Sequence, residues 1–226
     1  MTIPNSVKEV LSSAFNGCSS IQSLVFTGLT GGCSLGKDLT SLATWQVNSG
    51  CTSMIAENCY ALTSLTIPGT VTTVILTNCF DNNTEITIPA SVTSLRTVRC
   101  RMKKVIFEQR DPNVTFVTSK DLFTGCSNLQ TIENFPTNYS YESPTYVYSG
   151  LFTGCSSLTT LIQPPSNCTA IPIKLYNGCT SLQGTIEVPA TCTSIGQGAF
   201  YQCTSLTAVK IYATTPPSLN SATDTF

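Results

Sequence analysis

The chain has 226 residues, a formal net charge of −1, and only 10% charged residues. Hydrophobic residues make up 41%, which supplies a core and excludes a disordered chain. The near-neutral charge argues against nucleic acid or an anionic membrane as a partner, and no apolar run approaches the roughly 18 residues of a membrane-spanning helix. We therefore expect no nucleic-acid partner and no membrane insertion by this segment.

A strand that ends in Ile-Pro or Val-Pro is the first predicted element, and it recurs along the chain. It begins at Ile3, Ile67, Ile88 and Val188, in the segments IPNSVKEV, IPGTVTTV, IPASVTSL and VPATCTSI. Because proline has no N–H to donate to a ladder, it marks the end of each strand. Four residues later each segment holds Val or Cys, which predicts a small, buried apolar side chain there.

The next predicted element is a turn around a cysteine, with an aromatic residue before it and a Leu or Ile after it. AFNGCSSIQSLVF from Ala14 and LFTGCSSLTTLIQ from Leu151 are examples. The cysteines in phase are Cys18, Cys59, Cys79, Cys100, Cys126, Cys155, Cys179 and Cys203. From Cys59 onward they are separated by 20, 21, 26, 29, 24 and 24 residues. One degenerate coil, in which we assign Gly36 to the cysteine position, fills the gap before Cys59, and nine coils result.

Repeats at this period predict a solenoid, because one coil cannot bury its apolar side chains alone. The unit L-x-x-L-x-I-P-x-x-V-x-x-I-x-x-x-A-F-x-x-C resembles the BspA-like leucine-rich repeat of bacterial surface proteins, from Ile3 to Ile211. The resemblance implies an α/β fold, a right-handed leucine-rich-repeat superhelix of about nine coils. Each coil is expected to hold one short parallel strand and a short helical turn opposite, such as Gly196–Cys203. We expect one domain over 1–226, as part of a longer chain, with insertions at 108–121 and 134–149.

Twelve cysteines and no histidines leave three readings of the thiols: buried and free, one or two disulfides, or a metal site. There is no C-x-x-C pair of the zinc-ribbon type. Cysteines of a ladder point into the core in the same direction rather than toward each other. We favour buried free thiols and expect no metal and no cofactor.

Catalysis is not expected from this composition. The absence of histidine removes the commonest general base and the Ser–His and Cys–His pairs. Glycoside hydrolysis needs two carboxylates in one cleft, but Glu85, Glu133 and Glu187 fall on different coils. We predict that the chain is not an enzyme.

The insertion at 134–149 holds half of the eight tyrosines. These are Tyr139, Tyr141, Tyr146 and Tyr148. Tyrosine gives a rigid, amphipathic contact surface at low entropic cost, and it is favoured in binding surfaces. The alternative is a hairpin whose tyrosines pack back onto the solenoid. We name the four tyrosines as candidate ligand-binding residues and keep both readings.

A basic segment lies between residues 96 and 110. Its candidate ligand-binding residues are Arg96, Arg99, Arg101, Lys103 and Lys104, with Arg110 nearby. Residues two apart on a strand share a face, so Arg99, Arg101 and Lys103 are expected to align on a strand. The alternative is an ordinary solvated face, partly neutralised by Glu108 and Asp111.

The function that the resemblance implies is a cell-surface or secreted binding or adhesion module whose partner is an extracellular protein or a glycan. The alternative is a structural spacer or stalk segment of a larger surface protein. The N-terminus shows no signal-peptide pattern, which we attribute to an excerpt or a mature form. Apolar residues at both ends, without polar caps, predict end-to-end self-association.

Overall fold

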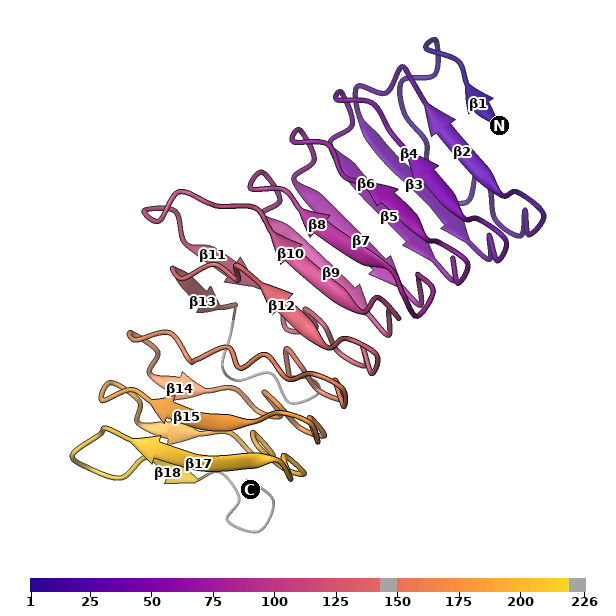
Figure 1. Ribbon diagram of the computed structural model, residues 1–226. Helices are drawn as coiled ribbons and strands as arrows, with labels where there is room; N and C mark the ends of the chain where they lie inside the picture. The colour runs from indigo at the N-terminus through magenta and orange to yellow at the C-terminus, as the bar shows by residue number, and fades with distance from the viewer. Residues whose placement is uncertain (143–149, 220–226) are drawn as a thin grey trace.

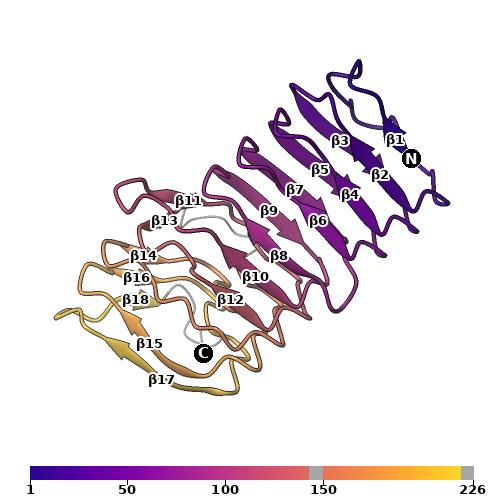
Figure 2. The ribbon, with the colours of Figure 1, turned by 45° about the horizontal axis from the view of Figure 1, so that its top comes forward.

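The computed structural model describes residues 1–142 and 150–219, which form a solenoid of parallel strands on two faces (Figure 1). The first face consists of β1 (Thr2–Ile3), β2 (Ser23–Phe26), β4 (Thr44–Gln46), β6 (Ser64–Thr66), β8 (Glu85–Ile88), β10 (Lys104–Phe107), β12 (Thr131–Glu133), β15 (Gly184–Val188) and β17 (Leu206–Ile211). The second face consists of β3 (Gly32–Lys37), β5 (Ser53–Glu57), β7 (Thr73–Thr77), β9 (Ser94–Val98), β11 (Phe116–Thr118), β13 (Tyr139–Tyr141), β14 (Ala170–Ile171), β16 (Ser194–Ile195) and β18 (Ser218–Leu219). Figure 2 shows β11, β13, β14, β16 and β18 following one another along the axis.

Most coils therefore have two strands, and the expectation of one strand per coil was wrong. The second strand is clearest in β5, where Met54 and Ala56 are buried and their neighbours are not. This alternation has the two-residue period of a strand with one face in the core. Met54 pairs in register with Val74 on β7, so buried side chains stack on buried side chains from coil to coil.

No helix is present in residues 1–142 and 150–219, so the helical part of the predicted α/β fold was also wrong. The segment expected to be a helical turn, Gly196–Cys203, is a succession of turns with hydrogen bonds between residues three apart, such as Tyr201 N to Gly198 O at 3.3 Å. Gly198 and Gln202 both have left-handed φ values, 63° and 61°. Too few right-handed residues lie between them to build an α-helix. Ala199 and Phe200 of this segment are buried.

Each coil within residues 1–142 and 150–219 turns from the second face toward the first through one left-handed residue. The nine residues at this position are Gly17, Asp38, Asn58, Asn78, Arg99, Gly125, Gly154, Gly178 and Gln202, with φ between 52° and 76°. Glycine, asparagine and aspartate tolerate this conformation best. The residue that follows each one belongs to the cysteine row. Because Asp38 is the left-handed residue of the degenerate coil, Leu39 occupies its cysteine position, and our assignment of Gly36 was wrong.

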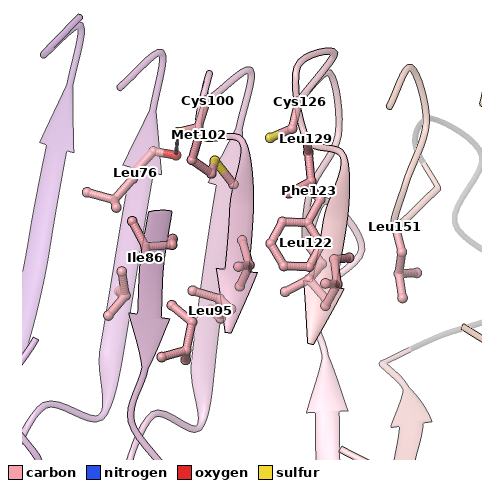
Figure 3. Packing of buried hydrophobic residues seen from close by; sticks show 14 of the residues in the cluster. Leu76, Ile86, Leu95, Cys100, Met102, Leu122, Phe123, Cys126, Leu129 and Leu151 are labelled. Carbon is pink, nitrogen blue, oxygen red and sulfur yellow. Dashed lines mark hydrogen bonds between the residues drawn. The ribbon is translucent and has the colours of Figure 1, made fainter. Parts of the chain in front are cut away.

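The cysteine row forms one edge of the core. All twelve cysteines are free, as favoured from the sequence; Cys18 and Cys203, near the two ends, are half-buried and the others are buried. Most thiols of the row donate to a carbonyl of the preceding coil, for example Cys100 Sγ to Leu76 O at 3.4 Å (Figure 3). Burial raises the pKa of Cys33 to about 12 and that of Cys203 to about 11. Raised values keep these thiols protonated and weakly reactive.

Hydroxyl side chains link successive coils at the corners of the solenoid. Thr72 Oγ1 donates to Thr52 O at 3.3 Å and Thr93 Oγ1 donates to Thr72 O at 3.4 Å. The same arrangement holds at Thr191, which donates to Cys168 O at 2.7 Å. Serine and threonine thus satisfy carbonyl groups at the corners, in a chain with few charged residues.

The coils are of two kinds. In the short-coil region, residues 32–100, the second-face strands continue up to the left-handed residue. In the long-coil region, residues 121–203, a turn separates the two. That turn places Phe123, Phe152 and Tyr176 in the core as a stack, with ring centroids 5.9 and 4.9 Å apart. The extra residues widen the core, and aromatic rings fill it.

The first face is interrupted between β12 and β15, where no strand forms at residues 159–163. Side chains replace the missing ladder there. The amide of Gln163 donates to Thr185 O and accepts from Glu187 N, both at 2.8 Å, as a peptide group would. Tyr176 Oη donates to Ile162 O at 2.6 Å and accepts from Ile162 N at 3.1 Å.

Candidate functional surfaces

The tyrosines of the 134–149 insertion that the structure describes belong to the core. Tyr139 lies on β13, is 6% exposed, and donates a hydrogen bond from Oη to Gln163 O. Its ring contacts those of Phe135 and Tyr141, with centroids 5.1 and 5.8 Å away. Burial raises the pKa of the Tyr139 and Tyr141 phenols. These two tyrosines pack in the widened coil, with Tyr139 buried and Tyr141 half-buried, which agrees with the packing alternative. Their role as ligand-binding residues stays a prediction.

Tyr146 and Tyr148, the other two tyrosines of the prediction, lie outside the described residues. Their role as ligand-binding candidates stays a prediction.

Two of the predicted basic residues are paired with acids. Arg96, on β9, lies 3.4 Å from the carboxylate of Asp121. Lys104 begins β10 and lies 2.7 Å from Glu133 on β12, and its hydrogen bond to Glu133 raises the pKa of its ammonium group. Both pairs join different coils and have at least one side chain open to solvent, and exposed pairs contribute little to stability. The positive charges of Arg96 and Lys104 are therefore largely neutralised within the protein.

Arg110 holds a loop against the preceding coil. Its guanidinium donates to the carbonyls of Pro89, Ala90 and Val92 at 2.9, 3.1 and 2.7 Å. It also lies over the ring of Phe116, 4.8 Å from the centroid. Burial lowers the pKa of this group. Arg110 is therefore part of the fold rather than of a free cationic surface.

The remaining three, Arg99, Arg101 and Lys103, are exposed, and none forms an ion pair with another described residue. They do not share a strand, so the expected alignment on one face was wrong. β9 ends at Val98 and β10 begins at Lys104, and Arg99 is the left-handed residue of its coil, with φ of 52°. All three instead lie in the connection between β9 and β10, at the corner where the chain passes from the second face to the first.

A loop at residues 108–115, within the expected insertion at 108–121, has a hollow on each side. One, of about 440 Å³, lies between this loop and residues 134–138. The other, of about 410 Å³, lies between the loop and residues 90–93 and has mostly apolar walls. Arg110, Asp111 and Val114 line both. The insertion was expected from the sequence, but Val114 was not among the expected site residues, and Arg110 and Asp111 were considered only for their charge.

Hydrogen bonds hold the loop in place. Asp111 Oδ1 accepts from Asn113 N at 2.9 Å, which fixes a tight turn. Asn138 of the next coil donates from Nδ2 to Pro112 O at 3.0 Å. Two aliphatic side chains nevertheless lie in solvent here: Val114 in the loop is 59% exposed, and Val117 on the adjoining strand β11 is 49% exposed. The loop is a well-anchored projection with an apolar surface.

Metal ligation and membrane spanning find no support in the part of the chain that the structure describes. No group of three or more Cys, Asp or Glu side chains there could hold a metal ion. Nor does any helix there have the length and apolar character needed to cross a bilayer.

Comparison with known proteins identifies the repeat. The sequence profile of the BspA type leucine rich repeat region matches residues 1–108, 52–182 and 99–221, with six copies. A solved leucine rich cell surface protein from Faecalibacterium prausnitzii A2-165 is 19% identical, with a TM-score of 0.35, covering 94% of this chain and 79% of its own. A leucine-rich repeat protein from Bacteroides ovatus ATCC 8483 is 17% identical, with a TM-score of 0.34, covering 97% and 82%. No curated protein matches.

The profile matches extend over nearly the whole chain, and they include both the short-coil and the long-coil regions. The cysteine row, the Ile-Pro strands and the stacked coils on which the sequence resemblance rested are all present in the structure. The chain belongs to the BspA type leucine-rich repeat family.

Proposed function

We propose that this chain is a non-catalytic binding module of a bacterial surface protein, and that the loop at 108–115 contacts an extracellular protein or glycan. The observation that carries the proposal is the pair of hollows on either side of this anchored loop. Per-repeat insertions on a solenoid map to loops, where binding residues concentrate. Family membership supports the surface location.

The chemistry of the loop fits protein or glycan recognition. Val114 and Val117 supply exposed apolar area beside the mostly apolar hollow. The other hollow is lined by polar groups of Gln109, Asn134 and Asn138. A small apolar patch flanked by hydrogen-bonding groups is the usual composition of a binding surface.

The test is a binding screen of the purified chain against extracellular-matrix proteins and glycans, with a V114S/V117S variant beside it. Leu11→Ser is the matched control, because Leu11 is 68% exposed on the first coil, far from the loop in the sequence. We expect the double variant to lose at least about tenfold in affinity, as for removal of central contacts, and the control to bind normally. Equal binding by all three proteins would exclude the loop.

A screen in which no ligand binds would favour the second reading, a spacer or stalk segment. The observation in favour of that reading is the regularity of the stack, in which the left-handed turns continue from the first coil to the last one described and a cysteine follows each of them except at Leu39.

A further inference from the structure

We propose that the corner formed by Arg99, Arg101 and Lys103, with Tyr60 beside it, binds an anionic polysaccharide, one that carries sulfate or carboxylate groups. This goes beyond the loop at 108–115. Arg110 anchors that loop at the turn before β9, whereas Arg99 follows the end of β9. The length of a five-residue strand, roughly 17 Å, separates the two places.

The first step is that some basic side chains of this segment form no ion pair within the part of the chain that the structure describes. Of the six basic residues between positions 96 and 110, three are engaged in the protein, as described above. Arg99, Arg101 and Lys103 have no acid partner among the described residues. Asp81, at the corresponding corner of the preceding coil, directs Oδ1 at Thr84 Oγ1, 2.6 Å away, and at the N–H of Asn83, 3.1 Å away. Three cations within five residues thus remain available to a ligand.

The second step is the fixed position of Arg101. Tyr60, Phe80 and Arg101 each come two residues after the left-handed residue of three successive coils. Phe80 itself has a φ of 75° and a fully buried ring. A bulky residue in this conformation is a genuine outlier.

Because the Phe80 ring points into the core, the side chains of Tyr60 and Arg101 can contact each other across the coil between them. The guanidinium carbon of Arg101 lies 5.3 Å from the centroid of the Tyr60 ring. Tyr60 Oη in turn donates to Asn58 Oδ1 at 3.1 Å. Tyr60 is thus a positioning residue that holds the guanidinium of Arg101 at the surface before any ligand arrives.

The third step is the conformation of Arg99. The left-handed position holds Gly, Asn or Asp in seven of its nine occurrences among the described residues, and Arg99 and Gln202 are the exceptions. This conformation is unfavourable for L-residues other than glycine, asparagine and aspartate. Asn58 and Asn78 show that asparagine fits the same turn in the neighbouring coils. Strain retained where a cheaper residue would fold as well points to a function for the side chain.

The fourth step is the class of ligand. Guanidinium groups bind sulfate and carboxylate through paired N–H donors. A protein partner would also need apolar anchor pockets, and both hollows of the loop are lined by other residues. Nucleic acid would need a longer basic surface than a chain with eleven basic residues and a net charge of −1 provides. A linear acidic polysaccharide needs only a few cations on an open corner.

The experiment measures binding of the intact chain to heparin, chondroitin sulfate and hyaluronan, of which the last carries carboxylates only. The test variant is R99N/R101Q/K103Q. Arg99→Asn installs the residue that Asn58 and Asn78 use at this turn, so the variant should fold, and circular dichroism checks this. The control, K8Q/K37Q/K174Q, removes the same three charges from other coils.

We expect binding that weakens with salt, a loss of at least about tenfold in the test variant, and little change in the control. Tyr60→Leu should weaken binding severalfold and Tyr60→Phe should not, because phenylalanine keeps the ring under Arg101. The V114S/V117S variant should bind these polysaccharides normally, so failure of the loop proposal would leave this one standing. Relative affinities for heparin and hyaluronan then separate sulfate from carboxylate recognition.

Three results would overturn the proposal. One is no binding to any of the three polysaccharides. Another is an equal loss in the test and control variants, which would mean that only net charge matters. The third is equal or tighter binding of an acidic peptide or of single-stranded DNA through the same residues.

Discussion

The short-coil and long-coil regions make the same turn between the two faces with different residues. Both must turn from the second face to the first through a left-handed residue. In the short coils the turn follows a strand directly, and amide side chains form a ladder there, with Asn58 Nδ2 donating to Asp38 Oδ1 at 2.7 Å and Asn78 Nδ2 donating to Asn58 Oδ1 at 2.9 Å. In the long coils glycine takes the turn at Gly125, Gly154 and Gly178, with φ from 73° to 76°.

The difference shows where each region obtains its stability. A short coil has a continuous main-chain ladder on its second face and a core made mostly of aliphatic side chains, without a stack of aromatic rings. A long coil gives up part of that ladder and gains a stack of aromatic rings. The two regions should therefore respond differently to loss of a ring, loss of a thiol and change at the turn.

The largest effect is expected from Tyr176→Ala. It removes a fully buried ring stacked 4.9 Å from Phe152 and leaves both main-chain groups of Ile162 without their partner. We expect a loss of about 3–5 kcal/mol in the free energy of unfolding, measured by urea denaturation. Leu76→Ala, in a short coil, should cost less, toward about 2–3 kcal/mol. Equal losses would mean that the aromatic stack does not distinguish the regions.

Alkaline pH tests the cysteine row, which both regions share. Burial raises the pKa of Cys79 and Cys155 well above its ordinary value. Their protonated forms therefore stabilise the folded state fully below the unfolded thiol pKa, near 8.5, and this contribution falls as pH rises above it. Each thiol should lose about 2 kcal/mol by pH 10, since the slope is about 1.4 kcal/mol per pH unit.

Two variants make the comparison. Cys79→Val in a short coil and Cys155→Val in a long coil should each flatten the decline of stability between pH 8 and pH 10 by the same amount, because valine does not ionise. Thermal unfolding at several pH values measures this. A flattening in only one of them would show that the row is not equally buried in the two regions.

A smaller effect is expected from exchange of the turn residues. Gly154→Ala should cost about 1–2 kcal/mol. A Cβ at Gly154 would meet nothing closer than 3.6 Å, so the cost is that of φ alone. Asn78→Gly should change stability by less than about 1 kcal/mol, because relief of φ offsets the lost amide bond. Chemical denaturation of the two variants would contradict this reading if Asn78→Gly were the more damaging.

The smallest effect is expected at the break in the first face. Gln163→Met keeps the length of the side chain but removes its bonds to Thr185 and Glu187. Because Gln163 is exposed, water can replace them, and we expect a loss of about 0.5–1 kcal/mol. Hydrogen exchange at the Glu187 amide should accelerate more than global stability falls. Unchanged exchange would mean that the amide does not act as a ladder segment.

The parts of the fold that repeat were predictable, and the parts that break the repeat were not. The cysteine row and the Ile-Pro strands recur in phase, so their burial and stacking followed from spacing. The two kinds of coil can also be distinguished in the sequence, because successive cysteines of the row are 20–21 residues apart in the short coils and 24–29 residues apart in the long coils. Tyr139 could be read as surface or core, because a tyrosine-rich insertion suits both. Nothing in the residues around Gln163 indicates that a side chain would stand in for a strand.

The candidate binding surfaces were also predictable only in part. Six basic residues close together in the sequence were visible at once, but which of them were neutralised depended on Asp121, Glu133 and the carbonyls of residues 89–92, all from other coils. The left-handed φ of Arg99 follows from its alignment with Asn58 and Asn78.

The hydroxyl bonds at the corners give the solenoid a direction. Thr72, Thr93 and Thr191 each donate to the coil before their own, as do the thiols of Cys100 and Cys155. Most of the hydroxyl bonds between coils run this way, although Thr97, Thr124 and Thr153 donate to the coil after their own. A tandem duplication of one coil would arrive already matched to the coil in front of it and would offer the same acceptors to the coil behind. Insertion or loss of a whole coil should therefore disturb few hydrogen bonds between coils, and the length of the solenoid is to that extent independent of its candidate binding surfaces.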